Sequence, residues 1–253
     1  MTGDVNPAGS PPPLLSSSPT SPPPPSQPPL PPLRQAQIAQ TEQRILAAAT
    51  ELFLADGYLA TTLEAVAKRA QVGARTVYLR FGTKALLFKR VVDVAIVGDT
   101  EPVDVLGRDW MQAAMTAPTA AERIAASAAA GRQIMTRTGA LFAVAQQAAA
   151  VEPLIAGFWQ QGREQTRHAH AIFWTRMVDD GLLAPTVDLE WLIDTSTILA
   201  AAETYLLITR LVGWDLDKYQ DWLATAFARL AQLPPAGTRV PPARPGVPPA
   251  GPA

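Results

Sequence analysis

Apolar side chains in the middle of the chain recur at the spacing of an α-helix. The first stripe consists of Ile45, Ala49, Leu52 and Phe53, at steps of four, three and one. It predicts a helix that begins near residue 37. The helix should end at Asp56, because Gly57 is placed to take the left-handed position that follows many helix C-termini.

Two short helices and a longer one are expected next. Thr61 and Glu64 have the spacing of a capping box and predict the start of the second helix. A break at residues 71–73 separates it from a short third helix over residues 74–81. Thr83 is placed to cap a fourth helix. Two short helices joined by a tight turn are typical of a helix-turn-helix unit.

The rest of the chain is predicted to be helical as well, with no β-branched alternation typical of strands. The expected helices cover about 105–116, 119–137, 139–151, 153–180, 188–212 and 216–231, with breaks at Pro118, Gly139, Pro153, residues 181–185 and residues 213–216. The fold class is therefore predicted to be all-α, with an N-terminal three-helix helix-turn-helix domain followed by a C-terminal helical domain.

Proline separates this helical middle from the two ends. Residues 1–33 hold 13 of the 25 prolines, and residues 234–253 hold eight more. Proline lacks the backbone N–H that packed secondary structure needs, so we expect disordered, Pro-rich tails over residues 1–35 and 233–253. The N-terminal tail could be passive, or it could act as a PxxP ligand for a partner domain, and the sequence leaves both interpretations open. The expected domains are then residues 36–97 and 98–232.

Charge differs between these two domains. Residues 34–98 carry nine Lys and Arg against five Asp and Glu, whereas residues 99–231 carry ten against sixteen. A basic unit joined to an acidic helical body is typical of a nucleic-acid reader with a separate regulatory part, although scattered surface charge could give the same totals.

Several function classes find no support in the residues. The chain has no cysteine, and no Gly-rich phosphate loop, G-x-S-x-G or H-E-x-x-H motif occurs, so we expect no enzyme, no cofactor and no metal. His168 and His170 are two apart and would point about 200° apart on a helix, which argues against a metal pair.

No membrane or export signal is recognised either. The longest apolar stretch, residues 198–212, is interrupted by Glu203 and Arg210, and the N-terminus lacks the basic and apolar regions of a secretory signal. A cytoplasmic protein with no membrane association is therefore expected.

The third helix carries the candidate chemistry. Val77 and Phe81 are four apart and should point inward, which leaves the opposite face outward. The residues expected on that face are Arg75, Thr76, Leu79 and Arg80, with Ala74 and Tyr78 at its flanks. Arginine can donate two hydrogen bonds to guanine, and hydroxyl groups can hold phosphates, so this face suits the major groove of DNA.

Residues 52–92 resemble the DNA-binding domain of the TetR family. The matching positions are Leu52, Phe53, Gly57, Tyr58, Thr61, Thr62, Ala67, Ala70, Val72, Thr76, Val77, Tyr78, Phe81, Lys84 and Leu87. The chain departs from the family pattern at three positions. Gln71 stands where Gly is common, Gly73 stands where Ser is common, and Leu79 is apolar where aromatic or polar residues are usual.

The resemblance implies double-stranded DNA as a partner, with a palindromic operator bound by a homodimer. The implied DNA contacts are Thr61, Thr62, Ala74, Arg75, Thr76, Tyr78, Arg80 and Lys84. Among them, Thr61, Thr62, Tyr78 and Lys84 are expected to meet phosphates. The last two helices are expected to pair with those of a partner through two stripes. The first stripe is Leu192, Leu199, Ala202, Leu206 and Thr209. The second is Trp222, Ala226 and Leu230, with Tyr219 and Leu223. Packing of both stripes within one subunit is the alternative.

The resemblance also implies a repressor released by a small molecule. Large apolar and sulfur-containing side chains in the body suit a lipophilic ligand. The candidate pocket residues are Trp110, Met115, Met135, Phe142, Gln146, Phe158, Trp159, Phe173, Trp174 and Met177. Ordinary core packing is the alternative for these residues. A helix-turn-helix protein without a small-molecule effector, either architectural or controlled by a protein partner, is the alternative for the function.

Overall fold

The computed structural model describes residues 32–101, 105, 107–184 and 186–232. Within these ranges every regular element is helical, as predicted. In chain order the elements are α1 (Pro32–Ala60), α2 (Leu63–Ala70), α3 (Ala74–Phe81), α4 (Lys84–Val97), α5 (Asp109–Thr116), α6 (Ala120–Ala149), α7 (Pro153–Asp179), α8 (Leu189–Ala200), α9 (Ala202–Leu207), the π-helical turn η1 (Ile208–Val212) and α10 (Leu216–Leu230).

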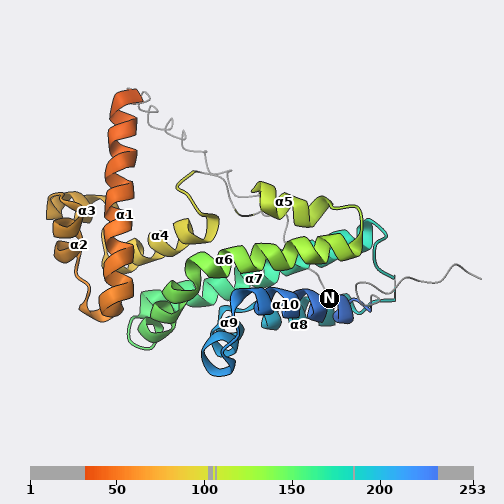
Figure 1. Cartoon of the computed structure of the whole chain (residues 1–253). Coiled ribbons are helices and arrows are strands. Elements are labelled where there is room, and N and C mark those ends of the chain that lie inside the picture. Colours follow the sequence, from red (N-terminus) through yellow and green to blue (C-terminus); the bar gives the residue numbers. More distant parts are fainter. Residues whose placement is uncertain (1–31, 102–104, 106, 185, 233–253) are drawn as a thin grey trace, which may run out of the picture.

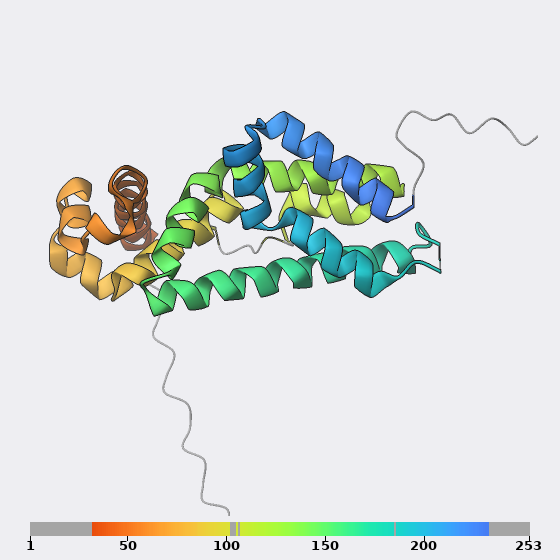
Figure 2. The same ribbon diagram turned by 90° about the horizontal axis from the view of Figure 1, so that it is seen from below.

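The helices form a small unit at one end of an elongated body (Figures 1 and 2). Helices α2 and α3 lie at the extremity, on the far side of α1 from the body. Helix α4 leads from this unit to the body, where the long helices α6 and α7 pack together. Helices α5 and α10 pack on α6, and α8 packs on α7. The arrangement places the short helix α3 where a large partner can reach it.

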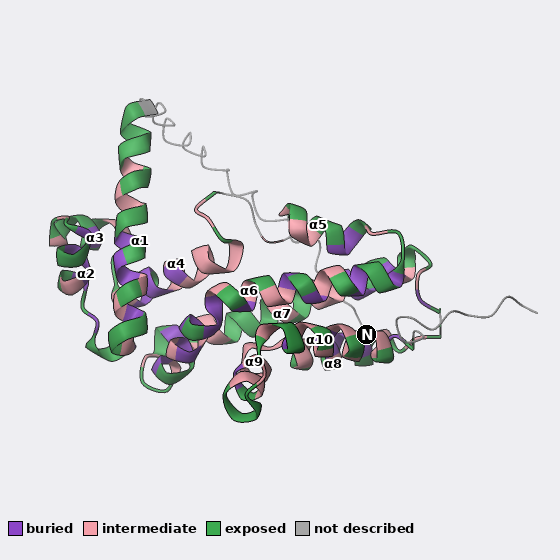
Figure 3. Cartoon of the chain, viewed as in Figure 1, coloured by how far each residue is buried: buried purple, intermediate pink, exposed green. Residues whose placement is uncertain are grey.

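Helix α1 begins earlier than the sequence predicts. It starts at Pro32 rather than near residue 37, so residues 32–35, assigned to the disordered tail, are helical. The first turns make little contact with the rest of the unit, and nearly all residues from Leu33 to Gln40 are exposed (Figure 3). Gly57 interrupts the helix near its end with φ 78° and ψ 174°, a positive φ that glycine adopts without a Cβ clash. The remaining predicted tail residues, 1–31 and 233–253, lie outside the described ranges.

The N-cap of α2 lies one residue later than predicted. Thr62 has extended backbone angles, and its hydroxyl oxygen accepts a hydrogen bond from the backbone N–H of Ala65. Thr61 is instead buried, and its hydroxyl donates to the carbonyl oxygen of Gly57 at 2.8 Å. The capping box predicted for Thr61 and Glu64 is therefore wrong. Thr83 does cap α4 as predicted, accepting from the N–H of Leu86.

Gly139 does not break a helix, contrary to the prediction. It lies inside the continuous helix α6, where its missing side chain makes room for the ring of Tyr205 from α9. A Cβ atom at Gly139 would stand 2.6 Å from Cε1 of Tyr205. This glycine therefore serves close helix packing, and sequence periodicity alone does not distinguish that use from a turn.

Two other predicted helices differ in extent. The helix expected over 188–212 is broken at Ala201, whose extended angles (φ −61°, ψ 146°) separate α8 from α9. The helix expected from residue 105 begins at Asp109. In the described part of the chain, no single helix has the length and hydropathy of a membrane span. Among these residues, only α8 and the α9–η1 segment taken together have that length and hydropathy, and the pair is bent by 43°.

Buried side chains form two clusters. The proximal core joins α1–α4 and includes Phe53, Tyr58 and Phe88, whose rings pack edge to face or stacked. It is completed by residues of α6 and α7, among them Leu141 and Ile155. Each large apolar side chain buried in this way contributes roughly 1.5–3 kcal/mol. The N-terminal unit therefore depends on the body to close its own core.

The distal core lies among α5–α10. Its largest buried side chains are Trp174, Tyr219 and Phe227. Indole Nε1 of Trp174 donates to Oγ of Ser196 at 2.8 Å, so this polar group is satisfied within the core. The hydroxyl of Tyr219 and Nδ1 of His170 are buried and have no hydrogen-bond partner among the described residues. Unsatisfied groups of this kind reduce stability.

We expect Gly139→Ala to destabilise the fold by about 1–2 kcal/mol, because the new methyl group must displace the Tyr205 ring. Gly162→Ala in α7 is the matched control, since no atom lies within 4 Å of its Cβ position. That control should gain about 0.5–1 kcal/mol from helix propensity. Urea denaturation measures both variants, and equal stabilisation by the two would contradict the packing role of Gly139.

Acid should weaken the fold through His170. Burial lowers the pKa of His170 to about 4 from 6.5, so between these values the unfolded chain binds a proton that the folded chain does not. The free energy of unfolding should therefore fall as pH drops from 6.5 towards 4, by ~3 kcal/mol from this group. His170→Leu should flatten this slope in urea titrations at several pH values. His168→Leu, at an exposed position of the same helix, should keep it.

Candidate nucleic-acid interface

Helix α3 presents the predicted face to solvent. Val77 is fully buried, whereas Arg75, Thr76 and Leu79 are exposed. Ala74 is half-buried at the flank and packs against the proximal core. No hydrogen bond or ion pair to Arg75 is formed within the described ranges, although most cations of this unit have partners. A free arginine beside a hydroxyl on an exposed helix can bind base edges or phosphates.

The turn between α2 and α3 holds α3 in place. The N–H of Val72 donates to the carbonyl of Ala67, and that of Gln71 donates to Lys68, which is the Schellman pattern of a helix end. Gln71 takes the left-handed conformation with φ 54° and ψ 46°, where the family usually has glycine. Arg44 of α1 donates to the carbonyls of Ala70 and Gln71. Its charge therefore stabilises the end of α2 and the strained turn together.

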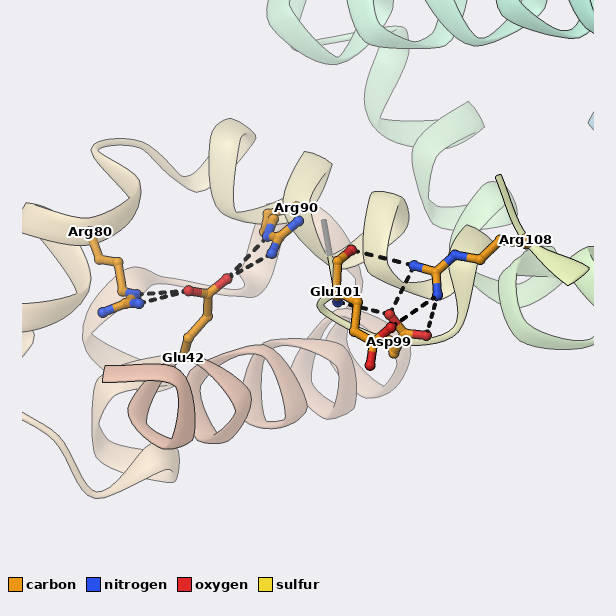
Figure 4. Close-up of polar contacts among 6 residues, drawn as sticks. All are labelled: Glu42, Arg80, Arg90, Asp99, Glu101 and Arg108. Carbon is orange, nitrogen blue, oxygen red and sulfur yellow. Dashed lines mark hydrogen bonds and ion pairs between the residues drawn. The ribbon is translucent and has the colours of Figure 1, made fainter. Parts of the chain in front are cut away.

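Glu42 of α1 accepts hydrogen bonds from two arginines (Figure 4). One carboxylate oxygen accepts from Arg80 of α3 at 2.7 Å, and the other accepts from Arg90 of α4 at 3.0 Å. Burial by itself raises the pKa of Glu42, but the hydrogen bonds and charges of the two arginines outweigh it and hold the pKa below its ordinary value. Three helices of the unit are thereby joined at one carboxylate.

This contact corrects the prediction for Arg80. The side chain was expected on the outward face of α3, yet its guanidinium turns back to α1 and is mostly covered. The sequence offered no signal for the pairing, because Glu42 precedes Arg80 by 38 residues and Arg90 by 48.

Lys84 is also engaged within the protein. Its ammonium donates to the carbonyls of Tyr58 and Leu59 at the end of α1 and lies 4.4 Å from the centre of the Tyr58 ring. Burial lowers the pKa of Lys84 despite the opposing charge of Glu152. A phosphate contact, as predicted, requires the ammonium to leave or share these carbonyls. That role stays a prediction.

The remaining residues predicted to contact DNA differ in their exposure to solvent. Thr62 and Tyr78 are exposed, and the hydroxyl of Tyr78 donates to Oε1 of Glu64, which raises the pKa of Tyr78. Thr61 is buried with its hydroxyl bonded to Gly57, so the structure contradicts a phosphate contact by this residue. The prediction followed from the match of Thr61 to the family pattern. In this structure the residue stabilises the fold.

Arg137 of α6 connects the N-terminal unit to the body. Its guanidinium donates to the carbonyls of Ala95 and Ile96 at the end of α4, at 2.8 and 2.6 Å. Beyond α4, Arg108 donates to both carboxylate oxygens of Asp99 (Figure 4). These hydrogen bonds to Asp99 lower its pKa. The direction of α4, and with it the placement of α3, is thus tied to α6.

A groove of about 520 Å³ lies beside this connection. It is lined by residues of α1, α4, the loop after α4 and α6, including Leu46, Thr50, Val94 and Arg137. We call it the hinge groove. A second groove of about 230 Å³ lies by α9 and η1, and its lining includes Gln146 and Leu211.

The ten predicted ligand residues are not brought together around one cavity. Met115, Met135, Phe173, Trp174 and Met177 are buried in the distal core. Phe158 and Trp159 pack against the proximal core, and Phe142 packs edge to face on Trp159. Trp110 lies beside Arg137, and only Gln146 lines one of the two grooves. Their part in ligand binding stays a prediction, and core packing accounts for the five buried side chains.

An exposed apolar surface runs along α8, α9 and η1. Its members are Trp191, Ile198, Leu207, Leu211 and Val212, each more than half exposed. We call it the α8–η1 face. It differs from the predicted stripe, because Leu192 is buried in the distal core and Leu206 is buried beside the second groove. In α10, Tyr219 and Leu223 are likewise buried, and Trp222 is half-buried.

Helices α2 and α3, the Schellman turn between them and the bracing helix α1 have the geometry of a helix-turn-helix motif. The molecule is thus a helix-turn-helix protein with a helical body. Residues 45–91 match the family model described as bacterial regulatory proteins, tetR family. This match assigns the N-terminal unit of the chain to the TetR family of transcriptional regulators.

A known transcriptional regulator is similar to part of this chain. The HTH-type transcriptional regulator TcmR of Streptomyces glaucescens is 29% identical over 107 residues, which are 42% of this chain and 42% of TcmR. The similarity thus spans less than half of that relative's length.

Solved structures share the fold over most of the chain. A TetR-family regulator from Mesorhizobium loti has a TM-score of 0.58 at 20% identity, over 76% of this chain and 96% of its own. SmeT in complex with triclosan has a TM-score of 0.60 at 18% identity, over 83% of this chain and 99% of its own.

We expect Arg75→Ala to weaken binding to a selected operator by roughly 1–3 kcal/mol and to relax the preference for one base. The reason is that the substitution removes an arginine that has no partner within the described residues and lies on the exposed face of α3. Arg69→Ala is the matched control. It removes the same charge from α2, but Arg69 is paired with Glu51. Titrations at two salt concentrations compare the variants. Equal losses would mean that Arg75 acts only through overall charge.

Proposed function

We propose that this protein is a sequence-specific, DNA-binding transcriptional regulator that inserts α3 into the major groove. The observation that carries this proposal is the exposed face of α3, where Arg75 has no partner in the described part of the chain and Thr76 lies beside it. The capped N-terminus of α2 supports it, because Thr62 exposes a hydroxyl at a helix end where phosphate binds favourably.

We further propose that it acts as a homodimer through the α8–η1 face. Five large apolar side chains more than half exposed on neighbouring elements need a cover, and a second copy supplies the same face by two-fold symmetry. A dimer reads a palindrome, with half-sites about 34–36 Å apart or a multiple of that distance.

We propose repression relieved by a small apolar molecule as the mode of control. The complex of SmeT with triclosan supports this, since a protein of the same fold binds such a molecule. Within this chain, the hinge groove has a volume typical of ligand sites and adjoins the contact of Arg137 with α4. A ligand favours release only if it binds better to the conformer in which α3 is misplaced.

Control without a small molecule is the second candidate. The observation that favours it is the packing of the predicted pocket residues, with Trp174 and Met177 fully buried in the distal core. A ligand at that place would have to displace close-packed side chains.

Selection of bound sequences from a random duplex pool, with purified full-length protein, tests the proposed function. We expect an enriched palindrome bound by a dimer. Salt-sensitive binding without an enriched sequence would indicate an architectural DNA-binding protein instead, and absence of binding would contradict the proposal.

Leu211→Asp tests the dimer, because it places a charge on the most exposed residue of the α8–η1 face. We expect a monomer in sedimentation and at least a tenfold loss of palindrome affinity. Leu154→Asp, at an exposed position of α7, should remain dimeric. A dimeric Leu211→Asp variant would place the interface elsewhere.

A further inference from the structure

Leu79 is an exposed apolar residue on the helix proposed to read DNA. Its exposed fraction is 75%, larger than that of Tyr78 at 45% on the same helix. It belongs to neither buried cluster nor to the partly buried residues packed against them. The fold therefore gives no reason for leucine here, and an exposed leucine is costly to hydrate.

The position of Leu79 on α3 is central. Successive residues of an α-helix are turned by about 100° from one another. Val77 and Phe81 define the inward side, and on this count Leu79 points about 180° away from their mean direction. Arg75 lies one turn earlier on the same side. A groove that receives the exposed face of α3 thus receives Leu79 at its centre.

The major groove offers an apolar side chain one favourable partner. Guanine, cytosine and adenine present hydrogen-bonding groups at their edges, whereas thymine adds a C5-methyl group. Leucine covers polar edges without replacing their bonds to water, which costs free energy. Against a thymine methyl it removes apolar surface from water instead.

We propose that Leu79 is a specificity-determining residue that selects thymine at one position of each half-site through contact with its methyl group. This inference rests on the proposed function, namely insertion of α3 into the major groove. It assigns to Leu79 a preference for a methyl group, and it leaves hydrogen-bonded base contacts to Arg75.

The alternative is that Leu79 belongs to a protein contact. Its neighbours on the exposed side of α3 are Arg75 and Thr76, with the exposed Tyr78 and its hydroxyl at the flank, so Leu79 is a single aliphatic group among polar ones. The largest group of exposed apolar side chains on neighbouring elements of the described chain lies on α8, α9 and η1. A lone leucine next to an unpaired arginine fits a groove with mixed polar and methyl groups better than a protein interface.

The test uses the palindrome that the wild-type protein selects, with each thymine replaced in turn by deoxyuridine, which lacks only the methyl group. For wild type we expect one position per half-site at which replacement weakens binding about fourfold, and about fifteenfold when both half-sites are changed. These values correspond to the burial of one methyl group per half-site. Leu79→Ala should bind the thymine operator more weakly and lose no further affinity with deoxyuridine.

Leu59→Ala is the matched control, because Leu59 is 71% exposed near the end of α1 and is not on α3. It should keep the full deoxyuridine effect. Circular dichroism of Leu79→Ala should show a nearly unchanged melting temperature, since the side chain is mostly exposed and belongs to neither core. If the wild type enriches no sequence, the proposed function fails. If it enriches one and both proteins respond equally to deoxyuridine, the role of Leu79 is refuted while DNA binding stands.

Discussion

The placement of α3 depends on cations that bind the carbonyl ends of neighbouring helices. The last carbonyls of a helix lack intrahelical partners and carry partial negative charge. Arg137 of α6 occupies those of α4, Lys84 of α4 occupies those of α1, and Arg44 of α1 occupies those at the end of α2. The three contacts form a continuous series from the body to the turn that precedes α3. Removing any one cation would take away these hydrogen bonds and weaken the connection at that helix end.

Apolar burial reinforces this series at the same place. The proximal core needs Leu141 and Ile155 from the body, so the N-terminal unit cannot turn freely about α4. Helix α6 contributes both Arg137 and Leu141, which makes it the body element whose position matters most for α3. The hinge groove lies against this helix. A molecule bound there would act on the connection itself, without a path through the distal core.

Local signals predicted the helix-turn-helix unit well. The bounds of α3, the cap of α4 at Thr83 and the inward face of Val77 follow from periodicity and capping chemistry within a few residues. Contacts between distant residues left no such signal, which is why the partner of Arg80 and the role of Gly139 were missed. Apolar and sulfur-containing side chains suit a core as well as a pocket. Their spacing alone therefore could not show that Met177 and Trp174 would be close-packed.

The left-handed conformation of Gln71 affects how readily the turn before α3 opens. A non-glycine residue in the left-handed region costs about 1 kcal/mol, and this cost is present only while the turn is closed. The equilibrium for local opening is therefore about fivefold more favourable than with glycine, and the amide hydrogen of Val72 should exchange with solvent correspondingly faster. The joint between α2 and α3 accordingly opens locally more often than a glycine turn would, whereas in the closed state Gln71 has a narrower range of angles than glycine and orients α3 more closely.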